Sequence, residues 1–105
     1  MRVIGTVVEQ ESGQPLAGLR VRAYDKDWVF DDDLGETRTD AEGRFEISYT
    51  DVQFRDLEET QPDLYLRVYA ADGERLLYSS EKAVRRSALV VEEFDIRIPR
   101  EKLAG

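Results

Sequence analysis

The chain has 105 residues, enough for one domain with one modest hydrophobic core, and its 41% apolar and 36% charged residues suit a globular protein. It contains neither cysteine nor histidine, which excludes disulfides, thiolate or imidazole metal sites, and Ser-His-Asp or Cys-His catalytic arrangements. The formal net charge of −8 argues against nucleic acid or an anionic membrane surface as partner, because both would repel the chain.

The N-terminal residues Met1–Gly5 carry no long apolar stretch of the kind found in secretory signals. No run elsewhere approaches the roughly 18–20 apolar residues that cross a bilayer. The absence of a signal predicts a cytoplasmic protein, while secretion by another route or membership of a larger assembly are the alternatives.

The first half of the chain predicts four short strands. Residues 2–9 are apolar on both faces, residues 19–24 alternate with a period of two, and residues 35–39 suit a polar strand near a sheet edge. Residues 45–49 predict a strand that pairs with residues 35–39 in a hairpin. The turn between them contains Asp40, whose side chain can bond backbone amides, and Gly43, which we expect at positive φ.

The second half predicts three more strands. Residues 50–63 lack a clear period and are expected to cross from one sheet to the other before Pro62. Residues 64–70 and 76–78 flank an Asp-Gly pair typical of a tight hairpin, residues 81–88 suit a loop or one helical turn, and residues 90–98 alternate again. Together the patterns predict an all-β fold, a seven-stranded antiparallel Greek-key β-sandwich forming a single domain over residues 1–105.

Several stretches resemble transthyretin-like domains, including the carboxypeptidase regulatory-like group. The opening Gly5-Thr6-Val7-Val8 with Ser12–Gly18 is similar to the start of these domains, and Leu34–Ile47 is similar to their "LG…TD..G.F.I" signature. Pro62–Val68 resembles a later strand, so the resemblance covers roughly Val3 to Ile98. These motifs describe turns and strand ends, and they identify a fold better than an activity.

The resemblance implies a non-catalytic accessory module of the kind found beside peptidases, carbohydrate-active domains, or large bacterial surface and toxin proteins. Two enzyme groups with this general fold rely on histidines, which the chain lacks. A carboxylate-based hydrolase would require two acidic side chains that converge in a pocket. We therefore expect no enzyme and no cofactor, but association with a protein partner or neighbouring domain, with self-association as an alternative.

An acidic run over residues 25–40 raises the question of a metal site. Calcium takes six to eight oxygen ligands, and the candidate ligands are Asp25, Asp27, Asp31, Asp32 and Asp33. The spacing does not follow the EF-hand loop, because counting from Asp31 places Glu36 where that loop needs glycine. The alternative is a solvated loop at one end of the sandwich. The corresponding second function is a calcium-dependent adhesion or carbohydrate-binding module.

Two sets of residues are candidates for partner binding. Trp28 and Phe30 lie inside the acidic run, where they suit either exposed anchors or a plug over the open end of the sandwich. Tyr65, Arg67 and Tyr69 alternate on one side of their strand and would form a mixed aromatic and cationic surface. The function predicted from these features is a binding or structural module that mediates protein association.

Overall fold

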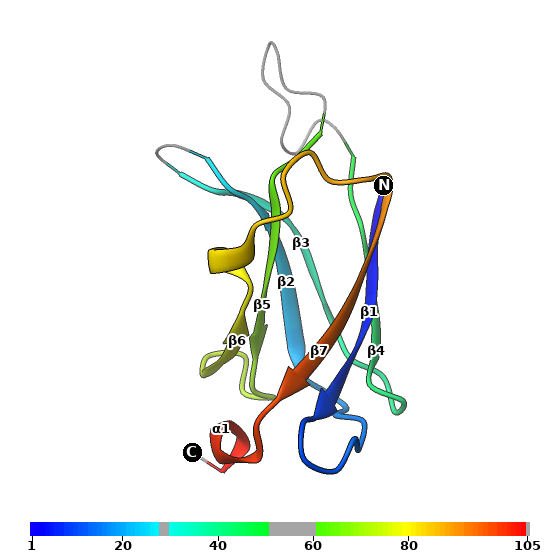
Figure 1. Cartoon of the computed structure of the whole chain (residues 1–105), viewed down its shortest axis with the longest axis vertical. Helices are drawn as coiled ribbons and strands as arrows, with labels where there is room; N and C mark the ends of the chain where they lie inside the picture. Colours follow the sequence, from blue (N-terminus) through cyan, green and yellow to red (C-terminus); the bar gives the residue numbers. More distant parts are fainter. Residues whose placement is uncertain (28–29, 51–60, 105) are drawn as a thin grey trace.

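The computed structural model describes residues 1–27, 30–50 and 61–104, and these residues form two β-sheets packed face to face (Figure 1). The strands are β1 (Arg2–Glu9), β2 (Arg20–Asp25), β3 (Asp32–Arg38), β4 (Arg44–Ser48), β5 (Leu64–Tyr69), β6 (Leu76–Ser79) and β7 (Val91–Ile98). A short 3-10 helix, η2 (Glu81–Ala83), follows β6, and helix α1 (Arg100–Leu103) ends the described chain. Neither helix is long and apolar enough to cross a membrane.

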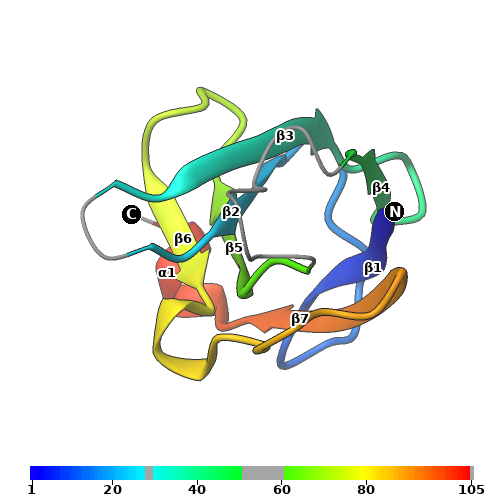
Figure 2. The same ribbon diagram turned by 90° about the horizontal axis from the view of Figure 1, so that it is seen from above.

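The three-stranded sheet has the order β4-β1-β7 and the four-stranded sheet the order β3-β2-β5-β6 (Figure 2). The all-β sandwich is thus confirmed, with one pair that differs from a wholly antiparallel arrangement: β1 and β7 are parallel. The segment after η2 carries the chain back to the end of the sandwich where β1 begins (Figure 1). There the amide of Arg2 donates to the carbonyl of Val90 at 2.8 Å, so β7 starts beside β1 and runs in the same direction.

The predicted hairpin between residues 35–39 and 45–49 is wrong, because β3 and β4 belong to different sheets. The turn itself forms, with the amide of Gly43 donating to the carbonyl of Asp40 at 2.9 Å and Gly43 at φ +75° as expected. Thr39, however, remains bonded to Leu19 beside β2, through its amide at 2.9 Å and its hydroxyl oxygen at 3.0 Å. Since Arg44 already pairs with β1, the turn is a corner between the sheets.

The hydrophobic core fills the space between the inner faces of the two sheets. The period-two patterns of residues 19–24 and 90–98 place the core residues of β2 and β7 correctly. The core strand residues are Val3, Val7, Val21, Ala23, Leu34, Phe45, Ile47, Leu64, Leu66, Val68, Leu77, Phe94, Ile96 and Ile98. Because successive strand residues point to opposite faces, the intervening polar and aromatic residues lie on the outer faces of the sheets.

Candidate functional site

The central strands of the four-stranded sheet, β2 and β5, place arginines and tyrosines on its outer face. Their neighbours in sequence are core residues, and this alternation directs the intervening side chains outward. The strand register forms three cross-strand pairs: Arg20 with Tyr69, Arg22 with Arg67, and Tyr24 with Tyr65. We call these six side chains the Arg-Tyr face.

Aromatic rings hold the middle of the Arg-Tyr face together. Tyr24 and Tyr65 are stacked, with ring centroids 5.0 Å apart and an angle of 17° between the ring planes. The guanidinium carbons of Arg22 and Arg67 both lie 5.3 Å from the centroid of the Tyr24 ring. Such cation–π contacts are attractive, and they offset part of the repulsion between the two neighbouring arginines.

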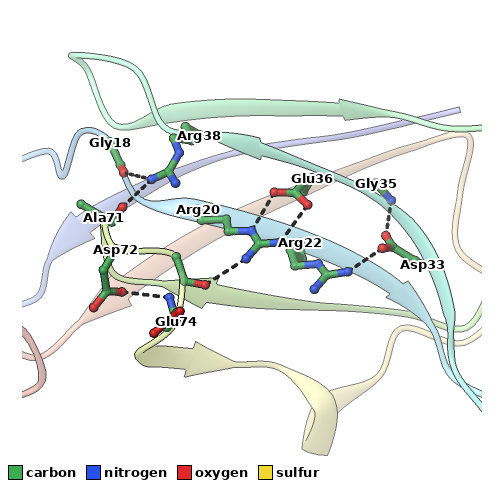
Figure 3. A network of polar contacts seen from close by, with 11 residues as sticks. Gly18, Arg20, Arg22, Asp33, Gly35, Glu36, Arg38, Ala71, Asp72 and Glu74 are labelled. Atoms are coloured by element: carbon green, nitrogen blue, oxygen red, sulfur yellow. Dashed lines mark hydrogen bonds and ion pairs between the residues drawn. The ribbon is translucent and has the colours of Figure 1, made fainter.

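Strand β3 supplies carboxylates along one border of this face (Figure 3). Arg20 makes a two-pronged ion pair with Glu36, at 2.6 Å from Nε and 2.9 Å from Nη2, and Nη1 donates to the Gly73 carbonyl at 2.9 Å. Arg22 donates from Nη2 to Asp33 at 2.5 Å. The two-pronged geometry fixes Arg20 in orientation as well as in charge.

Helix η2 supplies a carboxylate along the opposite border. Glu81 accepts from Lys26 Nζ at 2.6 Å and from Arg67 Nη2 at 2.7 Å. The pKa of the Glu81 carboxyl is lowered, first by the hydrogen bond from Lys26 and then by that from Arg67. Glu81 therefore connects the end of β2 to the middle of β5 as a bridging anion.

Tyr65 is the buried member of the Arg-Tyr face, with 1% of its area exposed. Its hydroxyl donates to Asp31, and burial together with this bond raises the pKa of the phenol. Burial alone would raise the pKa of Asp31, yet hydrogen bonds from Tyr65 and the Asp27 amide hold it below its usual value. Of the predicted partner-binding residues on β5, Arg67 and Tyr69 are therefore accessible in part and Tyr65 is a support.

Of the two aromatic residues in the acidic run, Trp28 and Phe30, the structure describes only Phe30. Trp28 lies outside the residues that the structure describes. Phe30 is 80% exposed, so its ring does not plug the end of the sandwich. An exposed ring of this size is consistent with a contact residue, and partner binding by Phe30 stays a prediction.

Three of the predicted calcium ligands accept hydrogen bonds from different parts of the chain. Asp25 is buried and accepts from the amide of Asp63 at 2.8 Å, whereas Asp31 accepts from the amide of Asp27 at 3.0 Å. Asp33 accepts from the amide of Gly35 at 2.8 Å as well as from Arg22.

Asp32 lies at the start of β3, in register with Asp25 on β2. Within residues 1–27, 30–50 and 61–104, no three acidic side chains are grouped as a metal ion would need. This arrangement does not favour the calcium hypothesis, which stays a prediction.

Sequence reasoning identified Tyr65, Arg67 and Tyr69 of this face but missed the ion pairs that border it. The alternation of Arg20 and Arg22 with apolar residues showed only that both point away from the core. Glu36 lies 16 residues from its partner Arg20, and Glu81 lies 14 residues from its partner Arg67, so no local pattern connects either pair. Strand register brings these groups together, and register was not available from the sequence.

A pocket of about 590 Å³ lies elsewhere on the sandwich. Its lining comes from both sheets and the corner between them, and includes Ile4, Thr37, Asp40, Arg44 and Glu46. Glu46 lies 3.4 Å from Arg2 in an exposed ion pair, which contributes little to stability or orientation. The Arg-Tyr face, with its shorter and connected contacts, is the stronger candidate.

Comparison with known proteins gives two matches of different kinds. Residues 12–90 match the transthyretin-like family. The crystal structure of a 9R-lipoxygenase from Cyanothece PCC8801 is similar at a TM-score of 0.66 and 24% sequence identity, over 93% of this chain and 16% of that chain. The chain thus spans about one-sixth of that enzyme, and the likeness shows the fold alone. No curated protein matches the chain significantly.

Proposed function

This chain belongs to the transthyretin-like family, and from that membership we propose that it is a non-catalytic module that binds a protein partner or a neighbouring domain. The binding surface is the Arg-Tyr face of its four-stranded sheet. The similar sandwich that makes up 16% of a lipoxygenase chain supports a modular role, because there the fold is one part of a larger protein. A family match of this kind indicates the type of module, and the binding function is argued from the residues of the site.

The observation that carries the proposal is the composition of this face together with its accessibility. Arginine and tyrosine are, with tryptophan, the residues enriched among interface hot spots. The side chains of Arg20 and Arg67 keep 26% and 33% of their surface exposed. Beside them Leu76, which pairs with Tyr69 in the strand register, is 50% exposed and adds an apolar contact.

The ionisation of the same groups supports binding rather than catalysis. A general acid or base works best with a pKa near the operating pH. Arg20 lowers the pKa of Glu36, and Lys26 and Arg67 lower the pKa of Glu81, so both pKa values lie further below pH 7 than those of free carboxyl groups. The pKa of Tyr65 is raised, so it lies further above pH 7 than that of a free phenol.

Site-specific photo-crosslinking tests this function. We would place p-benzoylphenylalanine at Leu76, beside the Arg-Tyr face, and at Arg97 of β7 as the control on the opposite sheet. After irradiation in a lysate of the source cells, the Leu76 position is expected to form an adduct with one discrete protein and the Arg97 position none. Equal adducts from both positions, or none from either, would refute the proposed surface.

A further inference from the structure

Arg22 and Arg67 form a pair of like charges directly opposite each other on adjacent strands. Such pairs are normally destabilising. Each guanidinium donates from Nη2 to one carboxylate, Asp33 or Glu81. The Nε nitrogens of both arginines are buried, and neither has a hydrogen-bond partner among the described residues. An arginine offers five N–H donors, of which four are on the Nη nitrogens. The single carboxylate bond at Nη2 of each arginine therefore leaves Nη–H donors that no carboxylate of the chain occupies.

We propose that the Arg22–Arg67 pair binds an acidic side chain of an extended segment in the partner protein, in exchange for Asp33 and Glu81. This inference rests on the proposed function and names the chemistry of the partner. Carboxylates are the natural ligands of paired guanidinium groups, because planar donors and planar acceptors match in geometry and charge.

The charges of the face and its border balance locally. Four cations and four carboxylates lie there, in a chain whose net charge is −8. The cations are Arg20, Arg22, Lys26 and Arg67, and the carboxylates are Asp31, Asp33, Glu36 and Glu81. Since charges beyond about 8 Å are largely screened at physiological salt, an approaching segment meets this local balance rather than the net charge.

The neighbouring pair of the strand register defines a second contact. Tyr69 follows Arg67 by two positions and pairs with the half-exposed Leu76. In an extended chain, residues two positions apart lie roughly 6.5–7 Å from each other on one face. A partner segment with an acidic residue and an apolar residue at positions i and i+2 therefore matches Arg67 and Tyr69 at the same time.

A polyphosphate fits this face less well than a carboxylate does. Its charges would continue past the Arg22–Arg67 pair and meet Asp33, Glu36 and Glu81 on the two borders. A single carboxylate needs only the central pair. Nucleic acid is therefore an alternative that the experiment must separate.

The test is a titration of the 15N-labelled protein, followed by amide chemical shifts. The probe is a short capped peptide that carries Glu-Thr-Leu in an otherwise uncharged Ser/Thr sequence, and the matched control peptide carries Gln-Thr-Leu. We expect shifts centred on Arg22, Arg67 and Leu76, and binding about tenfold weaker for the glutamine peptide, as for loss of one charged hydrogen bond. The same spectra report whether each variant is folded.

Variants with opposite expected effects keep the test sharp. Arg67→Gln should weaken binding of the glutamate peptide about tenfold. The double variant Asp33→Asn with Glu81→Gln should tighten binding, because it releases both arginines from competing carboxylates. The control Arg97→Gln, on the other sheet, should leave the affinity unchanged.

Three results would overturn the inference. They are equal binding of the two peptides, weaker binding by the folded double variant, and displacement of the peptide by a short single-stranded oligonucleotide that binds more tightly. If any of these results is found while the Leu76 crosslink still forms, the hypothesis of an acidic partner segment is refuted and the proposed protein-binding function stands. If the Leu76 crosslink does not form, the proposed function itself is refuted.

Discussion

Tyr24 and Tyr65 stack on adjacent strands of the four-stranded sheet, with centroids 5.0 Å apart. The Tyr24 ring also lies within 5.3 Å of two guanidinium groups, those of Arg22 and Arg67. One side chain therefore supports an aromatic stack and two cations. It is the position where a single substitution should affect the whole Arg-Tyr face.

Tyr24→Leu removes the ring but keeps apolar bulk. We expect it to lower the free energy of unfolding by about 1–2 kcal/mol, because one aromatic pair and two partly exposed cation–π contacts are lost. The control Tyr24→Phe keeps the ring and should stay within about 0.5 kcal/mol of the wild type. Urea unfolding followed by circular dichroism measures both. If the two variants lost equal stability, the hydroxyl rather than the ring would hold the face.

The positions of the strands could be predicted from the sequence because a half-buried strand alternates apolar and polar residues along the chain. In β7 the alternation of Phe94, Ile96 and Ile98 with charged residues is enough to identify both the strand and its buried side. The Asp72-Gly73 pair likewise predicted the β5–β6 hairpin, in which Gly73 has φ +80°. These features depend only on neighbours in sequence.

The arrangement of the strands and the candidate site depend on distant neighbours. The period of two predicted that Arg22 and Arg67 point outward, but not that they lie opposite each other, 45 positions apart in the chain. The corner at Asp40–Gly43 has the sequence of a hairpin turn, but the pairing of β3 with β2, continued by the bonds of Thr39 to Leu19, keeps β3 in the other sheet. Register and sheet membership are set by such tertiary contacts, to which a local pattern is insensitive.

Gly43 should be among the least replaceable residues. It has φ +75°, and an added Cβ would lie 2.5 Å from the Val7 carbonyl oxygen and 3.2 Å from the Leu16 amide nitrogen. We expect Gly43→Ala to cost about 3 kcal/mol or more, because backbone strain is joined by a clash with backbone atoms. Denaturant unfolding gives the value directly.

Gly13 is the matched control for this prediction. It has nearly the same backbone conformation, φ +73°, but no atom lies within 4 Å of an added Cβ. Gly13→Ala should cost only about 1 kcal/mol, the conformational part of the effect. If both variants lost a similar free energy of unfolding, the contacts of an added Cβ at Gly43 with Val7 and Leu16 would not contribute to the cost.

Calcium should leave the stability of the protein unchanged. The carboxylates of Asp31 and Asp33 are held by Tyr65 and Arg22, and a metal would have to displace these partners. Thermal unfolding in EDTA and then in millimolar calcium measures the effect. A ligand at a hundred times its dissociation constant adds about 2.7 kcal/mol, which would raise the midpoint by several degrees. A rise of that size, lost in an Asp31→Asn variant, would restore the metal site.

Acid should weaken the face through Glu81. Its pKa is lowered from the usual 4.5 by hydrogen bonds from Lys26 and Arg67. A carboxyl with a lower pKa in the folded state stabilises the fold above its unfolded pKa, and this contribution disappears as pH falls through the folded value. The free energy of unfolding should therefore decline below about pH 4.5, and Glu81→Gln should decline less steeply. Urea unfolding between neutral pH and about pH 3 measures both slopes. Parallel pH profiles for the two proteins would mean that the bonds of Glu81 to Lys26 and Arg67 do not contribute to folding.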